Sequence, residues 1–276
     1  MMVLISAFAD EISSDLDTQL NVLSSEGIQY LEFRGVWNKN VLRLSDEELS
    51  VIKGRLEEEG IRVSCIGSPI GKIKITDEFE SHIKDFERVI HVSKMMDTKY
   101  IRIFSFYGPE GQNVEEYRDE VIKRMNVLVR RAERNNVVLL HENERHIYGE
   151  SPQRCLDILQ SCASPSLRLA FDPANFVQSS VHPMMDAFPV LESFVEYVHI
   201  KDAHFQDGRV APAGEGDGDV TGLIHELKGR HYKGFLSIEP HLKWSKDYSH
   251  LDGPDAFRVA ARALKSVLEK NQVPWN

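Results

Sequence analysis

Short apolar runs alternate with amphipathic segments from one end of the chain to the other, and this alternation limits the fold more than any other feature. The apolar runs are typical of buried β-strands and lie at residues 3–8, 28–33, 61–66, 100–104, 137–142, 167–172, 197–201 and 235–239. The segments with helical spacing lie at residues 15–26, 45–59, 77–96, 114–134, 151–161, 184–194, 220–228 and 254–269. Strands that alternate with helices in this way predict right-handed crossovers and a parallel sheet.

Eight such strand–helix units fit within the 276 residues, and no break in composition marks a linker. We therefore predict a single α/β domain over residues 1–276, folded as a (β/α)8 TIM barrel with its active site at the C-terminal face. A doubly wound open sheet is the alternative. That fold often carries a Gly-x-Gly-x-x-Gly turn after its first strand, whereas this chain has Ala9-Asp10-Glu11 there.

Charge and hydropathy restrict the partners and the location of the protein. The chain has 33 basic and 43 acidic residues, and its net charge of −10 opposes binding to nucleic acid or to an anionic membrane. No apolar run approaches the length of a membrane span, and the run at residues 3–8 is too short for a signal peptide, so we predict a cytoplasmic protein. Cys65, Cys155 and Cys162 lack metal-ligand spacing and are predicted to be reduced and buried.

Four successive strands in the second half of the chain end at a residue that can bind a metal ion. These residues are Glu142, Asp172, His199 and Glu239. The loops that follow them are long, at roughly 143–150, 173–183, 202–219 and 240–253, and long loops in a compact domain are often functional. Because the strands of a closed barrel bring their carboxyl ends to one mouth, we predict that the four side chains converge there.

Three carboxylates at one mouth repel one another unless a cation or shared protons neutralise them. With one imidazole they form an oxygen-rich donor set, which favours Mn²⁺ or Mg²⁺ and also admits Co²⁺ or Zn²⁺. His141 has the opposite pleat parity from Glu142, so we predict that it faces the helices and is structural. The glycine-rich segment 214–219 contains acidic side chains that would repel a phosphate, and we interpret it as a turn in which Asp219 caps the next helix.

Several motifs resemble those of the xylose-isomerase-like TIM-barrel superfamily, and within it those of the sugar (phosphate) isomerase/epimerase group. The resemblance covers nearly the whole chain and is specific for the superfamily, not for one substrate. It rests on the residues 8–12 (Phe-Ala-Asp-Glu-Ile), 141–143 (His-Glu-Asn), 171–175 (Phe-Asp-Pro-Ala-Asn), 198–203 (Val-His-Ile-Lys-Asp-Ala), 214–217 (Gly-Glu-Gly-Asp) and 238–240 (Ile-Glu-Pro).

This resemblance implies one divalent metal ion held by Glu142, Asp172, His199 and Glu239, as in ketose 3-epimerases of the group, with Mn²⁺ favoured. It also implies that Glu142 and Glu239 form the acid/base pair that moves a proton next to a carbonyl through an enediolate. Reprotonation from the opposite face would give an epimer. Return of the proton to the neighbouring carbon would give an aldose–ketose isomer.

Three further residues, Asn175, Lys201 and Arg34, are candidate substrate contacts. Epimerases of this kind often carry a histidine three residues after the aspartate; Asn175 stands there instead and can still hydrogen-bond a hydroxyl. Lys201 has the pleat parity of the predicted metal ligand on its strand, and it either contacts the substrate or forms a salt bridge within the barrel. Arg34 either meets an anionic group or pairs with Glu32 or Asp10.

The sequence leaves other functions open. A metal-dependent dehydratase of a keto-polyol would use the same enolate and expel a hydroxyl from the next carbon. An endonuclease-IV-like hydrolase shares the fold, but it needs more histidines for a trinuclear zinc cluster, and the net charge of −10 opposes it. A non-catalytic sugar-binding barrel is disfavoured because Glu142 and Glu239 are both present. The predicted partner is a small sugar or keto-polyol, and homo-oligomers are frequent in the group that the chain resembles.

Overall fold

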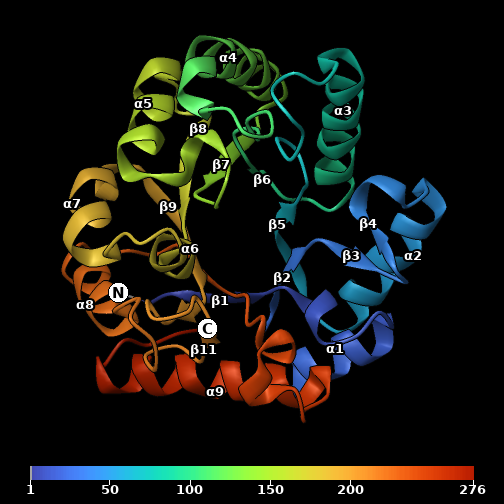
Figure 1. Ribbon diagram of the computed structural model, residues 1–276. Helices are drawn as coiled ribbons and strands as arrows, with labels where there is room; N and C mark the ends of the chain where they lie inside the picture. The colour runs from blue at the N-terminus through green and yellow to red at the C-terminus, as the bar shows by residue number, and fades with distance from the viewer. Residues whose placement is uncertain (1) are drawn as a thin grey trace.

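A computed structural model describes residues 2–276 and contains a closed parallel barrel within them (Figure 1). The barrel strands follow one another around the ring in the order β1-β12-β9-β8-β7-β6-β5-β2. Their bounds are β1 Leu4–Ala7, β2 Tyr30–Phe33, β5 Arg62–Gly67, β6 Tyr100–Ile103, β7 Val138–Glu142, β8 Leu167–Phe171, β9 Val195–Ile200 and β12 Phe235–Ile238. Because β1 pairs with both β2 and β12, the sheet closes on itself, and the doubly wound alternative is excluded. The prediction of a TIM barrel is confirmed.

The helices surround the barrel, and the two ends of the chain lie side by side, where Val3 bridges to Trp275 (Figure 1). The helices are α1 Leu16–Ser25, α2 Asp46–Glu58, α3 Phe79–Met95, α4 Arg118–Asn135, α5 Pro152–Cys162, α6 Pro173–Gln178, α7 Phe188–Leu191, α8 Val220–Gly229 and α9 Gly253–Lys270. Short hairpins extend two of the loops at the barrel mouth: β3 Gly35–Val36 with β4 Lys39–Asn40, and β10 Asp202–Ala203 with β11 Val210–Ala211. Within residues 2–276, no helix combines the length and the apolar character that crossing a membrane requires.

Two predicted segments differ from the structure. Residues 173–183, expected to be an irregular loop, begin with the short helix α6, because Asp172 caps its first turn and Pro173 suits the first helical position. The helix expected at 184–194 is divided into the π-helix η5 (Pro183–Ala187), α7 and the 3-10 turn η6 (Glu192–Phe194). Pro189 lies within this segment and has no N–H to donate, which prevents one regular helical ladder.

The alternation of side chains along each strand determines which residues reach the inside of the barrel. Leu140, Ala170 and Tyr197 belong to one small buried cluster inside the ring. Leu139, Leu169 and Val198 belong instead to the large core that the strands share with the helices, which includes Leu128, Ile158 and Leu223. A step of two residues along a strand keeps the same face. Glu142, Asp172 and His199, each two residues beyond a member of the inner cluster, therefore point into the barrel mouth.

A capping box closes the start of α2. The side chain of Ser45 accepts a hydrogen bond from the backbone N–H of Glu48, and the Glu48 carboxylate accepts one from the backbone N–H of Ser45, which completes a capping box at the start of α2. The three cysteines are free, and Cys65 and Cys155 are buried as predicted, whereas Cys162 is half-buried and not fully buried.

We predict that Ser45→Ala lowers the free energy of unfolding by about 1 kcal/mol, because the first turn of α2 loses the hydrogen-bond acceptor of its cap. Urea denaturation of the two proteins measures this difference. Ser50→Ala is the matched control, since Ser50 is exposed on the same helix and bonds only to the carbonyl of Asp46. Equal losses in the two variants would contradict a specific role of the cap.

Candidate metal centre and catalytic site

Glu142, Asp172, His199 and Glu239 converge at the C-terminal mouth of the barrel, and each offers one ligand atom within 4.8 Å of the others. Nδ1 of His199 lies 3.1 Å from Oε1 of Glu142 and 3.8 Å from Oε2 of Glu239. The distance from the same nitrogen to Oδ2 of Asp172 is 4.0 Å. Glu239 is the most exposed of the four residues, at only 3%. The predicted convergence is therefore present, and the mouth holds a compact donor set of three carboxylates and one imidazole.

Two buried cations neutralise part of this negative charge. The ammonium of Lys201 lies 2.9 Å from Oδ2 of Asp172 and 3.1 Å from Oε2 of Glu239, to which it donates a hydrogen bond. Nη1 of Arg102 donates to Oε2 of Glu142 over 2.7 Å. Of the two roles considered for Lys201, the salt bridge within the barrel is present, and the side chain also borders the mouth cavity. Arg102 comes from β6 and was not identified from the sequence.

Burial and the charges of the cluster shift the pKa values of its members. Burial would lower the pKa of His199, but the negative charges of Glu142 and Glu32 outweigh it and raise that pKa well above its ordinary value. Burial would raise the pKa of Glu142, but His199 and Arg102 hold it well below its usual range. Burial raises the pKa of Asp172 to about 6, against the opposing charge of Lys201. Without a metal ion, the imidazolium is thus a large part of the positive charge at the centre.

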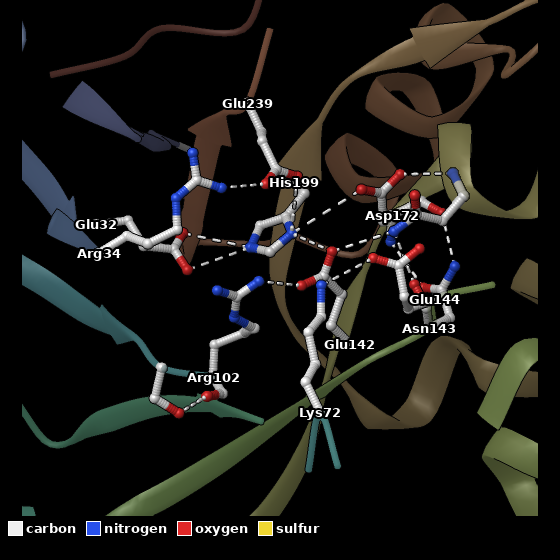
Figure 2. Close-up of polar contacts among 12 residues, drawn as sticks. Glu32, Arg34, Lys72, Arg102, Glu142, Asn143, Glu144, Asp172, His199 and Glu239 are labelled. Carbon is white, nitrogen blue, oxygen red and sulfur yellow. Dashed lines mark hydrogen bonds and ion pairs between the residues drawn. The ribbon is translucent and has the colours of Figure 1, made fainter. Parts of the chain in front are cut away.

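Glu32, at the inner face of β2, holds the other side of the histidine (Figure 2). Both of its carboxylate oxygens lie 3.3 Å from Nε2 of His199, and the Glu32 side chain is fully buried. Figure 2 shows the imidazole between Glu32 on one side and Glu142, Asp172 and Glu239 on the other. Glu32 does not form the salt bridge with Arg34 that the sequence allowed.

Arg34 instead belongs to a group at the rim of the mouth. It donates to Asp10 over 2.8 Å and to Glu239 over 2.9 Å, which confirms one of its two predicted pairings, that with Asp10. Its remaining nitrogen lies 3.2 Å from Glu11, and Glu11 also lies 3.2 Å from Nε2 of His241. The charges of Glu239 and Glu11 overcome burial and raise the pKa of His241 to about 9. The contacts of Glu11 and His241 in this group, like the roles of Arg102 and Glu32, were not predicted from the sequence.

Asparagines fix the ends of β7 and β8 relative to each other. The amide of Asn143 donates to the carbonyl of Asp172 and accepts from its N–H, both over 2.9 Å. Asn175 donates to Oε1 of Glu142 over 3.1 Å and to the carbonyl of Asn143 over 2.9 Å. Asn175 therefore supports the side chain of Glu142 directly, and its role as a substrate contact stays a prediction.

A cavity of about 350 Å³ opens above this cluster. Its walls are formed by Arg34, Asn40, Gly67, Pro69, Lys72, Arg102, Phe104, Glu142, Glu144, Lys201, Glu239 and His241. These side chains are mostly polar and of both charges, which suits a small ligand with many hydroxyl groups. Glu142 enters the cavity wall from β7 and Glu239 enters it from the end of β12.

The donor set fits a divalent metal ion. Nδ1 of His199 is buried without a hydrogen-bond partner among the described residues, and it faces Oδ2 of Asp172, which is ion-paired with Lys201. Buried polar atoms normally find a partner, so an unpaired nitrogen among three carboxylates favours a further group there. Three carboxylates and one imidazole match the preferences of Mn²⁺ or Mg²⁺ and also admit Zn²⁺.

His141 and the glycine-rich segment lie outside this cluster, as predicted. His141 is fully buried against Gly149, where a Cβ atom on that glycine would lie 2.3 Å from the imidazole. In the segment 214–218, the N–H groups of three glycines donate to the carboxylate of Asp202 over 2.8–3.0 Å. This turn therefore binds a carboxylate of its own chain, and Asp219 caps α8 through the N–H of Gly222.

Comparison with known proteins places the chain in an enzyme superfamily. A model of the family described as xylose isomerase-like TIM barrel matches residues 20–267. The 3-dehydroshikimate dehydratase of Bacillus anthracis is 20% identical over 210 residues, which cover 74% of this chain and 73% of that protein.

Two solved structures show the likeness of fold. The IOLI protein with a binding zinc atom has a TM-score of 0.78 at 17% identity, with coverage of 98% of this chain and 99% of that one. The structure of L-ribulose 3-epimerase has a TM-score of 0.72 at 15% identity, with coverage of 98% and 96%. The chain belongs to the xylose isomerase-like TIM-barrel family, as its motifs indicated, and its structural neighbours include sugar epimerases.

The buried His141 generates a prediction about acid stability. Burial lowers the pKa of His141 to about 4, whereas an unfolded histidine titrates near pH 6.5. Between these values only the unfolded state binds the proton. The contribution of the neutral, buried His141 to the free energy of unfolding is therefore complete above pH 6.5 and is lost as the pH falls toward 4. The loss is on the order of 3 kcal/mol, at about 1.4 kcal/mol per pKa unit.

We predict that His141→Leu flattens the dependence of unfolding free energy on pH between 6.5 and 4. Urea denaturation at several pH values, in the presence of a chelator, measures this slope for the variant and the parent protein. His225→Leu is the control, because His225 is exposed on α8. An unchanged slope in His141→Leu would show that this histidine is not a buried neutral group.

Proposed function

We propose that this protein is a divalent-metal-dependent isomerase or epimerase of a sugar or keto-polyol. The observation that carries the proposal is the pair Glu142 and Glu239, two buried carboxylates that reach one polar cavity from strands β7 and β12 and share a histidine between them. Membership in an enzyme superfamily whose neighbours include sugar epimerases supports it.

Glu142, Asp172, His199 and Glu239 would hold the metal ion, with Mn²⁺ favoured by the donor set. When bound, a divalent ion supplies Lewis-acid stabilisation of negative charge on a substrate carbonyl oxygen. Arg102 and Lys201 keep Glu142 and Glu239 ionised, as the lowered pKa values of both glutamates indicate. An ionised carboxylate is the form that can remove a proton from carbon.

The two glutamates have different neighbours, which suits them to different roles. Glu142 accepts hydrogen bonds from Arg102 and Asn175, neither of which gives up a proton readily, and we assign it as the base. Glu239 accepts hydrogen bonds from Lys201 and from Arg34, and we assign to it the delivery of a proton taken up from solvent on that side of the cavity. Proton removal by Glu142 and delivery from the side of Glu239 would invert the carbon centre. Delivery to the adjacent carbon would give the isomer.

Hydroxyl-rich substrates fit the remaining side chains. Arg34, Lys72 and His241 line the cavity beside Glu144. The cations are paired with carboxylates, since Lys72 lies 3.3 Å from Glu144 and Arg34 bonds to Glu239. The cavity wall therefore offers both hydrogen-bond donors and acceptors, which recognition of several hydroxyl groups requires.

A metal-dependent dehydratase is the second candidate, and the similarity to the 3-dehydroshikimate dehydratase of Bacillus anthracis favours it. Glu142 would remove the proton in the same way. The pair of Lys201 and Glu239 would then protonate the hydroxyl that leaves from the next carbon as water. The two functions thus differ in the destination of the second proton, and product analysis separates them.

The test is a screen of ketoses, inosose-type ketones and sugar phosphates in D₂O with Mn²⁺ present, followed by NMR. We predict deuterium at a carbon next to the carbonyl together with a new epimer or isomer. Glu142→Gln should reduce the exchange rate roughly a hundred- to ten-thousand-fold, because the base is lost. Glu133→Gln, an exposed change on α4, is the control and should keep the parent rate.

Product formation with loss of water would support the dehydratase instead. Retained exchange in Glu142→Gln, with metal content and fold unchanged, would remove Glu142 from the role of base. Absence of any exchange or elimination by the metal-loaded parent protein across the screen would contradict both candidate functions.

A further inference from the structure

We infer that Glu32 is a positioning residue for the metal centre: it accepts the Nε2–H of His199 and so presents Nδ1 of that histidine to the metal ion. This inference rests on the proposed function, because it concerns the metal on which that function depends. It assigns a role to a side chain on β2, on the far side of the imidazole from the three carboxylate ligands (Figure 2).

The two nitrogens of His199 face different surroundings. Nε2 lies 3.3 Å from both carboxylate oxygens of Glu32. Nδ1 lies 3.1 Å from Oε1 of Glu142, faces Asp172 and Glu239 at greater distance, and has no hydrogen-bond partner among the described residues. If the ring were turned by 180°, carbon atoms would face both sides. The positions of the carboxylates therefore select one nitrogen for Glu32 and leave the other for a cation.

Aromatic packing holds the imidazole in this plane. The ring of Phe8 meets it edge-on at 5.2 Å between centroids, and the ring of Tyr197 meets it at 5.8 Å with an interplanar angle of 90°. All three side chains are fully buried. Because neither neighbour can move without disturbing the barrel interior, rotation of His199 is restricted and the hydrogen bond to Glu32 selects the tautomer.

The surroundings of Glu32 argue against a role in stability alone. Within residues 2–276 its carboxylate has His199 as its hydrogen-bond partner, and its Oε2 makes no hydrogen bond of good geometry. A fully buried carboxylate without a permanently charged hydrogen-bond partner is costly to fold. A carboxylate behind a metal-competent histidine orients the imidazole and makes it a better ligand. This role accounts for the presence of Glu32 at a position where burial is costly.

The test compares Mn²⁺ affinity by calorimetry, without substrate, in the parent protein, Glu32→Gln and Glu32→Ala. We expect binding about 10–100-fold weaker in Glu32→Gln, and at least as weak in Glu32→Ala, because the amide keeps an acceptor and the methyl group does not. Glu26→Gln is the matched control. Glu26 is a mostly buried glutamate that pairs with Lys265 at 3.1 Å and lies outside the cluster, so its loss should change stability and leave the affinity unchanged.

NMR of the parent protein labelled with ¹⁵N-histidine gives a second readout that does not depend on how the variants fold. With Zn²⁺ bound, we expect His199, assigned by the loss of its signals in His199→Asn, to carry the metal on Nδ1 and a slowly exchanging proton on Nε2. Metal on Nε2, or equal Mn²⁺ affinity in folded Glu32→Gln, would overturn the inference about Glu32 and leave the proposed function standing. Absence of divalent-metal binding by the parent protein would overturn both.

Discussion

The mouth of this barrel depends on the balance of charge among carboxylates that are removed from water. Glu32, Glu142, Asp172 and Glu239 are all buried, and together they could not stay ionised in one small volume without cations. The structure supplies Arg102, Lys201 and the imidazole of His199. A bound divalent ion would replace the positive charge of the imidazolium, because histidine binds a metal ion as the neutral imidazole. The same crowding that makes the site costly to fold thus suits it to binding a cation.

The barrel makes this arrangement possible because it fixes the direction of each ligand separately. Each of β7, β8, β9 and β12 contributes one side chain of the cluster within one residue of its C-terminal end. Their registers are fixed by the parallel ladders below, and the amide of Asn143 joins the end of β7 to that of β8. The outer residues of the same strands pack on the helices, so stability comes from the surrounding core while the inner face is left for chemistry.

Much of the site could be predicted from the sequence, because the direction in which a side chain points follows from its pleat parity within a single strand. The ends of four strands showed Glu142, Asp172, His199 and Glu239, and parity correctly separated His141 from them. The contact of Glu32 with His199 could not be found in this way, because β2 and β9 are not neighbours in the ring and meet only across its interior. Arg102 did leave a signal, as a charged residue in an apolar strand. Helix α6 was missed because its residues are almost all buried and show no amphipathic pattern.

The central claim is that the four strand-end residues bind one divalent metal ion. A crystal structure of the protein grown with Mn²⁺, with anomalous diffraction recorded at the manganese absorption edge, tests it most directly. The account predicts one anomalous peak per chain, coordinated by Glu142, Asp172, Nδ1 of His199 and Glu239. A peak at other residues, or no peak in crystals that contain Mn²⁺ at millimolar concentration, would contradict it.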